Sequence, residues 1–377
     1  MRVRGVRVFD GERLLPAADV VVEDGVIASV TPSASPGGRQ TLLPGLIDAH
    51  VHVSPTPEVA LRDLLAHGVT TALDMFAGGE PLARLRELRD ADPAGLAGVR
   101  TAGIGAVGAD SMLAKMAGSP LPTVTDPVAW VDDRLRDGAD YLKIVYDERE
   151  GGRLDLATVS ALVSAAHARG VRIVAHAVTE QRAREAIGAG VDGLAHLFAG
   201  ETCGADFGAF AAAHGVFVIP TLTVLRGFCG YRDGDLPGVP GGSPGGFPPV
   251  RPADPSRHHL YAAAPAAVRL LAAAGVPMLA GTDTALPTAA LGVIGFGRTL
   301  HRELELLVEA GLSATAALRA ATAAPARAFR LADRGLVRPG LRADLLLVDG
   351  DPTADIHDIR QVAAVWKRGV PFQGVGS

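Results

Sequence analysis

The feature that most constrains this chain is an alternation of short apolar runs with helical patterns, which extends from residue 45 to residue 283. Strand-like runs separated by helical segments are typical of βαβ units, in which successive strands lie parallel. Eight parallel strands are the number that forms a barrel in this class. The sequence therefore predicts an α/β fold built as a (β/α)8 barrel, with strands within residues 45–53, 69–75, 99–107, 141–147, 171–178, 193–198, 216–225 and 276–283.

Several segments between these runs have helical patterns that stop at a glycine. Glycine commonly follows the last turn of a helix because it adopts the left-handed conformation without a steric penalty. A further helical pattern covers residues 313–331, and we expect Pro325 to kink or split it. The glycine-terminated helices are expected within residues 58–68, 156–170, 180–190, 267–276 and 303–311.

The two ends of the chain have a different pattern, in which strands are joined by turns such as "EDG" (23–25) and "VDGD" (348–351). Neither end is long enough to form a stable sheet alone, so we expect both to pair in one small β domain. The expected division is residues 1–41 plus 335–377 as a composite β domain, and residues 42–334 as the barrel.

One long segment, residues 227–259, interrupts the alternation. Eight glycines and seven prolines among its 33 residues cannot sustain a helix or a strand. Because it follows the seventh strand, at the barrel end where active sites form, we interpret it as a lid in preference to a linker.

Composition excludes several classes of protein. Hydrophobic residues make up 48% and charged residues 20%, as in a folded soluble enzyme, and the net charge of −5 comes without a basic cluster that would indicate nucleic-acid binding. Only two cysteines occur, so a disulfide framework or a CxxC metal site is not expected. The N-terminus lacks the apolar core of a signal peptide, and no strongly apolar run indicates a membrane span. We expect a cytoplasmic enzyme with a small-molecule substrate, and a homo-oligomer is compatible with the sequence.

Polar residues suited to binding metal recur at or near the ends of the predicted strands. His50 and His52 end the first run, and strand geometry puts side chains two residues apart on the same face. The carboxyl ends of barrel strands meet at one rim, where active sites are found. The candidate site therefore comprises six residues: His50, His52, Lys143, His176, His196 and Asp283.

The other histidines serve as a comparison. Three lie in the last turns of predicted helices, where an imidazole favours the negative end of the helix dipole, and we interpret them as capping residues: His67, His167 and His214. Others are kept as candidates for contact with substrate, along with side chains able to meet a carboxylate: His258, His259, His301, Tyr146, Arg226, Tyr231, Arg232, Arg251 and Arg257.

Four imidazoles and a carboxylate are good ligands for zinc or a similar divalent ion, and two such ions can share one site. Lys143 is harder to explain, because an ammonium repels dications and cannot act as a ligand. Its amine must be neutral, or carbon dioxide must convert it to a carbamate whose two oxygens can bridge two metals. The alternative is that Lys143 pairs with Asp140 or Asp147 at the rim.

Taken together, several of these sequences resemble the amidohydrolase superfamily over essentially the whole chain, most closely its imidazolonepropionase-like and prolidase-like branch. They are the strand histidines together with "PGLIDAHVH" (44–52), "YLKIVYD" (141–147), "GTD" (281–283) and "PGLRADLLLVDGDP" (339–352). The resemblance implies a TIM barrel with a composite β-sandwich formed from both ends. It also implies hydrolysis of an amide-type C–N bond in a small molecule, such as a linear or cyclic amide, a dipeptide or an N-acyl amino acid.

The same resemblance implies a role for each candidate residue. One ion would be held by His50, His52 and Asp283, and the other by His176 and His196. Carbamylated Lys143 and a hydroxide would bridge the two ions, and Asp283 would move the proton during hydrolysis.

Three alternatives remain open. A mononuclear deaminase would place a glutamate shortly after the fifth-strand histidine, where this chain has "HAVTE", with Thr179 third and Glu180 fourth. Lactonases or esterases use the same ligands, although the lactonases generally lack the terminal β segments. A non-catalytic assembly protein is disfavoured because all six ligands are present.

Overall fold

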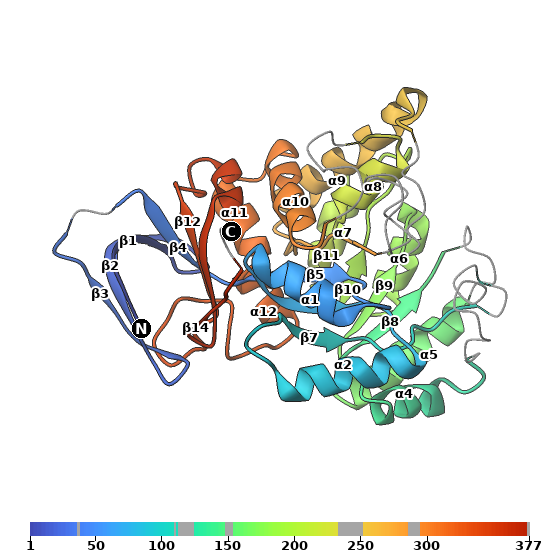
Figure 1. Ribbon diagram of the computed structural model, residues 1–377. Coiled ribbons are helices and arrows are strands. Elements are labelled where there is room, and N and C mark those ends of the chain that lie inside the picture. The colour runs from blue at the N-terminus through green and yellow to red at the C-terminus, as the bar shows by residue number, and fades with distance from the viewer. Residues whose placement is uncertain are drawn as a thin grey trace.

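The computed structural model describes residues 1–35, 38–108, 111, 124–147, 154–232, 252–285 and 295–374. It has two parts, a barrel of parallel strands surrounded by helices and a sheet made from both ends of the chain (Figure 1). This is the α/β architecture that the alternation of runs predicts.

Seven barrel strands form two parallel sheets, in the orders β5-β6-β7 and β11-β10-β9-β8. The eighth predicted run lies between these sheets and meets both through isolated parallel bridges, Val218 with Met278 and Val51 with Thr284. On the other side, a bridge from Ala106 to Ile144 joins the segment after β7 to β8. All eight predicted runs are thus linked in a ring. The strands are β5 (Leu46–Val51), β6 (Val69–Asp74), β7 (Gly98–Thr101), β8 (Leu142–Val145), β9 (Ile173–His176), β10 (Gly193–Ala195) and β11 (Phe217–Ile219).

Helices surround the strands because these strands are apolar on both faces, as expected for a parallel sheet. The barrel helices are α1 (Pro57–Ala66), α2 (Gly79–Ala91), α4 (Pro127–Arg136), α5 (Leu156–Ala168), α6 (Glu180–Gly188), α7 (Phe207–Ala213), α8 (Leu222–Phe228), η2 (Pro255–Ala262), α9 (Ala263–Ala273), α10 (Arg298–Glu309), α11 (Ala314–Ala320) and α12 (Ala323–Ala328).

The helix ends follow the sequence signals. Gly68, Gly170, Gly190, Gly275 and Gly311 have positive φ angles directly after helices, which confirms the predicted stop positions. The predicted helix over residues 313–331 is split into α11 and α12. The break falls just before the turn that contains the proline, so the proline occupies the first turn of α12, where its missing N–H costs little.

Strands from both ends of the chain form one seven-stranded sheet, in the order β14-β13-β12-β4-β1-β2-β3. The predicted composite sandwich is built as a sheet that curls over its own apolar core, because the residues after Gly340 hydrogen-bond back to Gly25 and Ile27. The strands are β1 (Arg2–Phe9), β2 (Leu14–Glu23), β3 (Val26–Pro32), β4 (Gln40–Pro44), β12 (Leu345–Asp349), β13 (Val362–Lys367) and β14 (Val370–Pro371), with η4 (Ile356–Arg360) between β12 and β13.

Most of the predicted lid, residues 227–259, lies outside the described residues, since residues 233–251 are not among them. Within the described part of the chain, no helix combines the length and apolar character needed to cross a membrane.

One lysine attaches the terminal sheet to the barrel. Lys367 of β13 has no exposed side-chain surface, and its ammonium lies 2.6 Å from Asp92 Oδ1 at the end of α2. The same ammonium donates hydrogen bonds to Pro93 O at 2.9 Å and Leu96 O at 2.7 Å. Removal of one partner from such a buried ion pair strongly destabilises the fold, because it leaves the other charge without its partner.

We expect Lys367→Met to lower the free energy of unfolding by about 2–4 kcal/mol, because it leaves Asp92 and two carbonyl oxygens without their buried donor. The measurement is urea denaturation of the purified protein. Arg368→Ala is the matched control, since Arg368 also approaches Asp92, at 3.8 Å, but is 56% exposed. A loss in Lys367→Met no larger than in Arg368→Ala would contradict the role assigned to the buried ammonium.

Candidate metal centre

Three side chains converge where the first and eighth barrel segments meet. Asp283 Oδ1 lies 3.3 Å from His50 Nε2 and 3.0 Å from His52 Nε2, and the two Nε2 atoms are 3.3 Å apart. His50 is almost completely buried, whereas His52 and Asp283 keep 24% and 17% of their side chains exposed. Two imidazoles and a carboxylate directed at one partly open point form a group that could hold a metal ion.

A shift of pairing register near the end of β5 directs the two histidines. Ile47 and Ala49 face the inner core of the barrel, but Val51 packs in the outer core beneath the helices. The inward and outward faces of the chain therefore exchange between residues 49 and 51, as at a β-bulge. As a result, His50 and His52 both turn toward the centre of the barrel end.

The backbone of the eighth segment fits closely against β5. Asp283 N donates to His50 O at 2.7 Å, and His52 N donates to Thr284 O at 2.9 Å. A side chain at Gly281 would place its Cβ only 2.7 Å from His50 N, so glycine is required there. Asp283 itself has a φ of 55°, a left-handed conformation that non-glycine residues adopt at a cost of roughly 1–2 kcal/mol.

A buried carboxylate, Asp48, joins the same two segments. It accepts hydrogen bonds from His50 N and Thr282 N, each at 3.1 Å, and from Thr282 Oγ1 at 2.8 Å. Burial raises the pKa of Asp48 to about 7, although these three donors favour its charged form. Asp48 thereby fixes the position of both parts of the chain that carry the first group of candidate ligands.

The second pair of histidines lies beside the first group. His176 ends β9 and His196 follows β10, and their ring centroids are 4.5 Å apart. The ring of His196 is also 4.9 Å from that of His50, and its Nδ1 lies 4.0 Å from Asp283 Oδ2. His176 Nε2 is 3.7 Å from Asp147 Oδ2 at the end of β8. His196 therefore connects the two groups of candidate ligands.

Lys143 lies within β8 and is 3% exposed. Burial is the main cause that lowers the pKa of His50, to about 3, and the Lys143 charge adds to this effect. Burial also lowers the pKa of His196, with the charges of His176, His50 and Lys143 acting in the same direction. Hydrogen bonding to Asp283 raises the pKa of His52 in spite of burial. An ammonium at Lys143 is therefore close enough to disfavour positive charge on the histidines.

Sequence reasoning missed two residues that support His196. Thr221 Oγ1 lies 2.8 Å from His196 Nδ1, and both residues have left-handed backbones, with φ angles of 49° and 74°. Glu303 of α10 is fully buried and accepts hydrogen bonds from Leu222 N and Thr223 N, each at 2.8 Å, and from Thr223 Oγ1 at 2.6 Å. The available signal for Glu303 was its position on the apolar face of a predicted helix. No spacing in the sequence, however, indicates that this helix contacts the segment around Thr221.

Four of the remaining histidines lie in or directly after helices. His67 and His214 cap α1 and α7, and His167 lies in the last turn of α5, as predicted. His301 was wrongly kept as a substrate candidate. Its Nε2 contacts His67 O, just before β6 begins, and therefore at the opposite end of the strands from the candidate centre.

A cluster of aromatic and basic side chains follows β11. Tyr231 stacks on His258 with ring centroids 3.6 Å apart, and the Arg226 guanidinium lies 3.9 Å from the centre of the Tyr231 ring. By contrast, Tyr146 donates a hydrogen bond to Glu185 at 2.7 Å. Arg251 lies outside the described residues.

Comparison with known proteins was made with both sequence and structure. The model of the amidohydrolase family matches residues 41–371. An uncharacterised protein of Mycobacterium tuberculosis is 31% identical over 329 residues, which cover 82% of this chain and 80% of that protein. A Xaa-Pro dipeptidase crystallised with methionine in its active site is similar with a TM-score of 0.78 and 21% identity, over 99% of both chains. A candidate prolidase from Bifidobacterium longum has a TM-score of 0.78 and 25% identity, over 100% of this chain and 96% of its own.

We expect Thr221→Val to weaken divalent metal binding by about 10–100-fold, because the variant keeps the side-chain shape but removes the hydroxyl that orients His196. Competition with a chelating dye measures the affinity. Thr41→Val is the matched control, since Thr41 is also a buried threonine with a side-chain hydrogen bond, to Gly350 O at 2.6 Å, but lies in β4. Equal metal affinity in the two variants would show that the Thr221 hydroxyl has no such role.

Proposed function

The chain belongs to the amidohydrolase family, and from this membership we propose that it is a metal-dependent hydrolase that cleaves an amide-type C–N bond in a small molecule. The observation that carries the proposal is the convergence of His50, His52 and Asp283 on one partly open point. Linear and cyclic amides, dipeptides and N-acyl amino acids are the substrate classes to test. The likeness to the Bifidobacterium candidate prolidase adds dipeptides that end in proline.

The donor set fits divalent ions such as zinc. Imidazole nitrogen and carboxylate oxygen are the ligands that zinc takes when no thiolate is present, and burial lowers the pKa of His50 and His196, which favours their neutral, ligating form. We assign His50, His52 and Asp283 to one ion and His176 and His196 to a second. Such ions polarise a carbonyl oxygen and lower the pKa of bound water toward about 7.

Lys143 is the residue best placed to contribute an anion between the two groups. It is buried beside several imidazoles, where a permanent ammonium would oppose any dication. The neutral amine can attack carbon dioxide, which forms an N–C bond, releases one proton and leaves a carbamate with two ligand oxygens. We therefore propose that Lys143 is carbamylated in the active protein.

Asp283 is proposed to move the proton. Its Oδ1 contacts both His50 and His52, and part of the side chain is exposed, so a substrate and a water molecule can reach it. The carboxylate would accept a proton from the attacking water as the new C–O bond forms. It would then donate that proton to the amide nitrogen as the C–N bond breaks.

The contacts of Glu180 argue against a deaminase. Thr179 caps α6, and the two carboxylate oxygens of Glu180 accept hydrogen bonds from Arg184 at 2.7 Å and from Gly204 N at 2.6 Å. Glu180 is therefore committed to structure and not available for proton transfer. A lactonase or esterase acting at the same centre is the second candidate, because the proposed ligands would activate an ester carbonyl equally well.

A chelator should abolish hydrolysis, and elemental analysis should find about two divalent ions per chain. Asp283→Asn should retain most of the metal while lowering turnover by a factor on the order of 10² or more, since the proton shuttle is lost while the histidine ligands remain. A screen with dipeptides, N-acyl amino acids, cyclic imides and lactones supplies the substrate. Asp132→Asn, which alters an ion pair with Arg169 on the outer helices, is the control. One ion per chain with full activity would favour a mononuclear site.

Lys143→Ala and Lys143→Arg should both lose activity and bind less metal, because neither side chain can be carbamylated. Small carboxylic acids added with excess metal should partly restore the alanine variant by supplying the missing anion. They should not restore the arginine variant, whose side chain fills the space. Normal activity with two bound ions in Lys143→Arg would refute the carbamate.

A further inference from the structure

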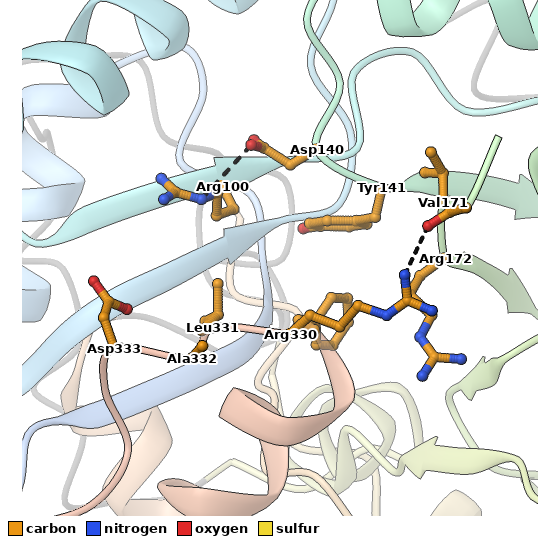
Figure 2. A pocket seen from close by; sticks show the side chains of 11 residues that line it. Arg100, Asp140, Tyr141, Val171, Arg172, Arg330, Leu331, Ala332 and Asp333 are labelled. Atoms are coloured by element: carbon orange, nitrogen blue, oxygen red, sulfur yellow. Dashed lines mark hydrogen bonds and ion pairs between the residues drawn. The ribbon is translucent and has the colours of Figure 1, made fainter. Parts of the chain in front are cut away.

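A cavity of about 400 Å³ lies at the end of the barrel strands opposite to the candidate metal centre (Figure 2). Asp140 and Tyr141 directly precede β8, Val171 and Arg172 directly precede β9, and the segment after α12 forms the facing wall. Arg172 directly precedes β9 and His176 ends it, four positions further on, which corresponds to about 13 Å in an extended strand. The cavity is therefore distinct from the histidine cluster.

Aromatic side chains close the cavity off from the barrel interior. The ring centroid of Phe329 lies 4.9 Å from that of Tyr141 and 5.4 Å from that of Phe217. Tyr141 is anchored in turn by a hydrogen bond from its hydroxyl to Asp74 O at 2.7 Å. A ligand in this cavity would pack against an apolar floor and could not reach the metal ligands.

Three arginines from three separate segments of the chain line the cavity, and Figure 2 shows them on two sides of it. Arg100 of β7 faces Asp140, with 3.6 Å between its Nε and the carboxylate. Arg172 binds Asp192, and its Nε is buried without a hydrogen-bond partner among the described residues.

The third arginine is directed toward the cavity from the opposite wall. Arg330 donates a hydrogen bond to Gly170 O at 2.8 Å, which holds its guanidinium beside the start of β9. No carboxylate of the described residues lies within 4.0 Å of this guanidinium, whereas the other two arginines each have one. Its φ of 56° is left-handed, so the backbone holds a conformation unfavourable for arginine at this position.

The two carboxylates of the lining do not offset this charge, because each is already paired. Asp140 is shared between Arg89, at 3.3 Å, and Arg100. Asp333 lies 2.8 Å from Arg334 Nε and 3.8 Å from Arg342. The cavity therefore keeps an excess of positive charge next to an apolar floor.

We propose that this cavity binds a small organic anion, with a carboxylate or phosphate head group held by Arg330 and Arg172 and an apolar body packed against Phe329. Guanidinium groups bind the paired oxygens of both head groups through two parallel hydrogen bonds. A cavity of this volume is in the range of small-molecule sites, and a bare inorganic anion would leave its apolar floor uncovered. The proposal is independent of the hydrolase function, since it uses none of the metal ligands.

Calorimetric titration with benzoate, phenyl phosphate, neutral benzamide and inorganic phosphate tests the site. The titrations are made on the protein as purified and after chelation, because an anion bound at the metal centre is lost with the metal whereas one bound here is retained. We expect benzoate or phenyl phosphate to bind at least about tenfold more tightly than benzamide and inorganic phosphate. The tighter of the two organic anions identifies the preferred head group.

Arg330→Gly is the decisive variant, because glycine accepts the left-handed backbone at residue 330 while the arginine side chain with its guanidinium is removed. Binding should weaken by about tenfold or more, while hydrolysis at the metal centre stays unchanged. Arg327→Ala is the control for overall charge, since Arg327 pairs with Glu12 and does not line the cavity. Equal binding of organic anions by wild type and Arg330→Gly, equal binding of benzoate and benzamide, or no binding of any probe after chelation would overturn the proposal.

Discussion

The three hydrogen bonds to the buried carboxylate of Asp48 are the interaction on which the candidate centre depends. They join the end of β5 to the segment around Thr282, and these two stretches carry His50, His52 and Asp283. Both stretches leave regular strand geometry at this point, so ladder hydrogen bonds alone do not fix them. A side-chain acceptor that binds donors from both stretches keeps the side chains of His50, His52 and Asp283 close to one another.

The sequence could predict the elements of the barrel, because strand and helix periodicities and glycine stops are local signals, and strand ends indicated where His50, His52 and Asp283 would meet. It could not predict the register shift in β5, because the inward-facing Ile47 and Ala49 and the outward-facing Val51 are all apolar. Thr221 and Glu303 were missed for a related reason, because their roles arise from contacts between elements far apart in the chain. His301 was misjudged because a position in the first turns of a predicted helix does not reveal which end of the barrel the side chain faces.

Left-handed backbones at His196, Thr221 and Asp283 show how the centre is kept in shape. Each conformation is unfavourable for a residue with a side chain, and persists only where the surroundings hold it. The surroundings here are the buried Glu303 beneath α8 and the close approach of Gly281 to β5. The shape of the candidate centre is thus held by the helices and loops behind it.

The position of β4 in the terminal sheet has a consequence for biosynthesis. β4 lies between β1 and β12, so one of its edges is unpaired until residues 345–349 have been made. Translation at about 5–20 residues per second takes roughly 15–60 s to cross the intervening ~300 residues. An apolar strand edge exposed for that time is a template for pairing with other chains. Pairing of β4 with β12 therefore closes an edge of the N-terminal strands that is open to other chains for most of synthesis.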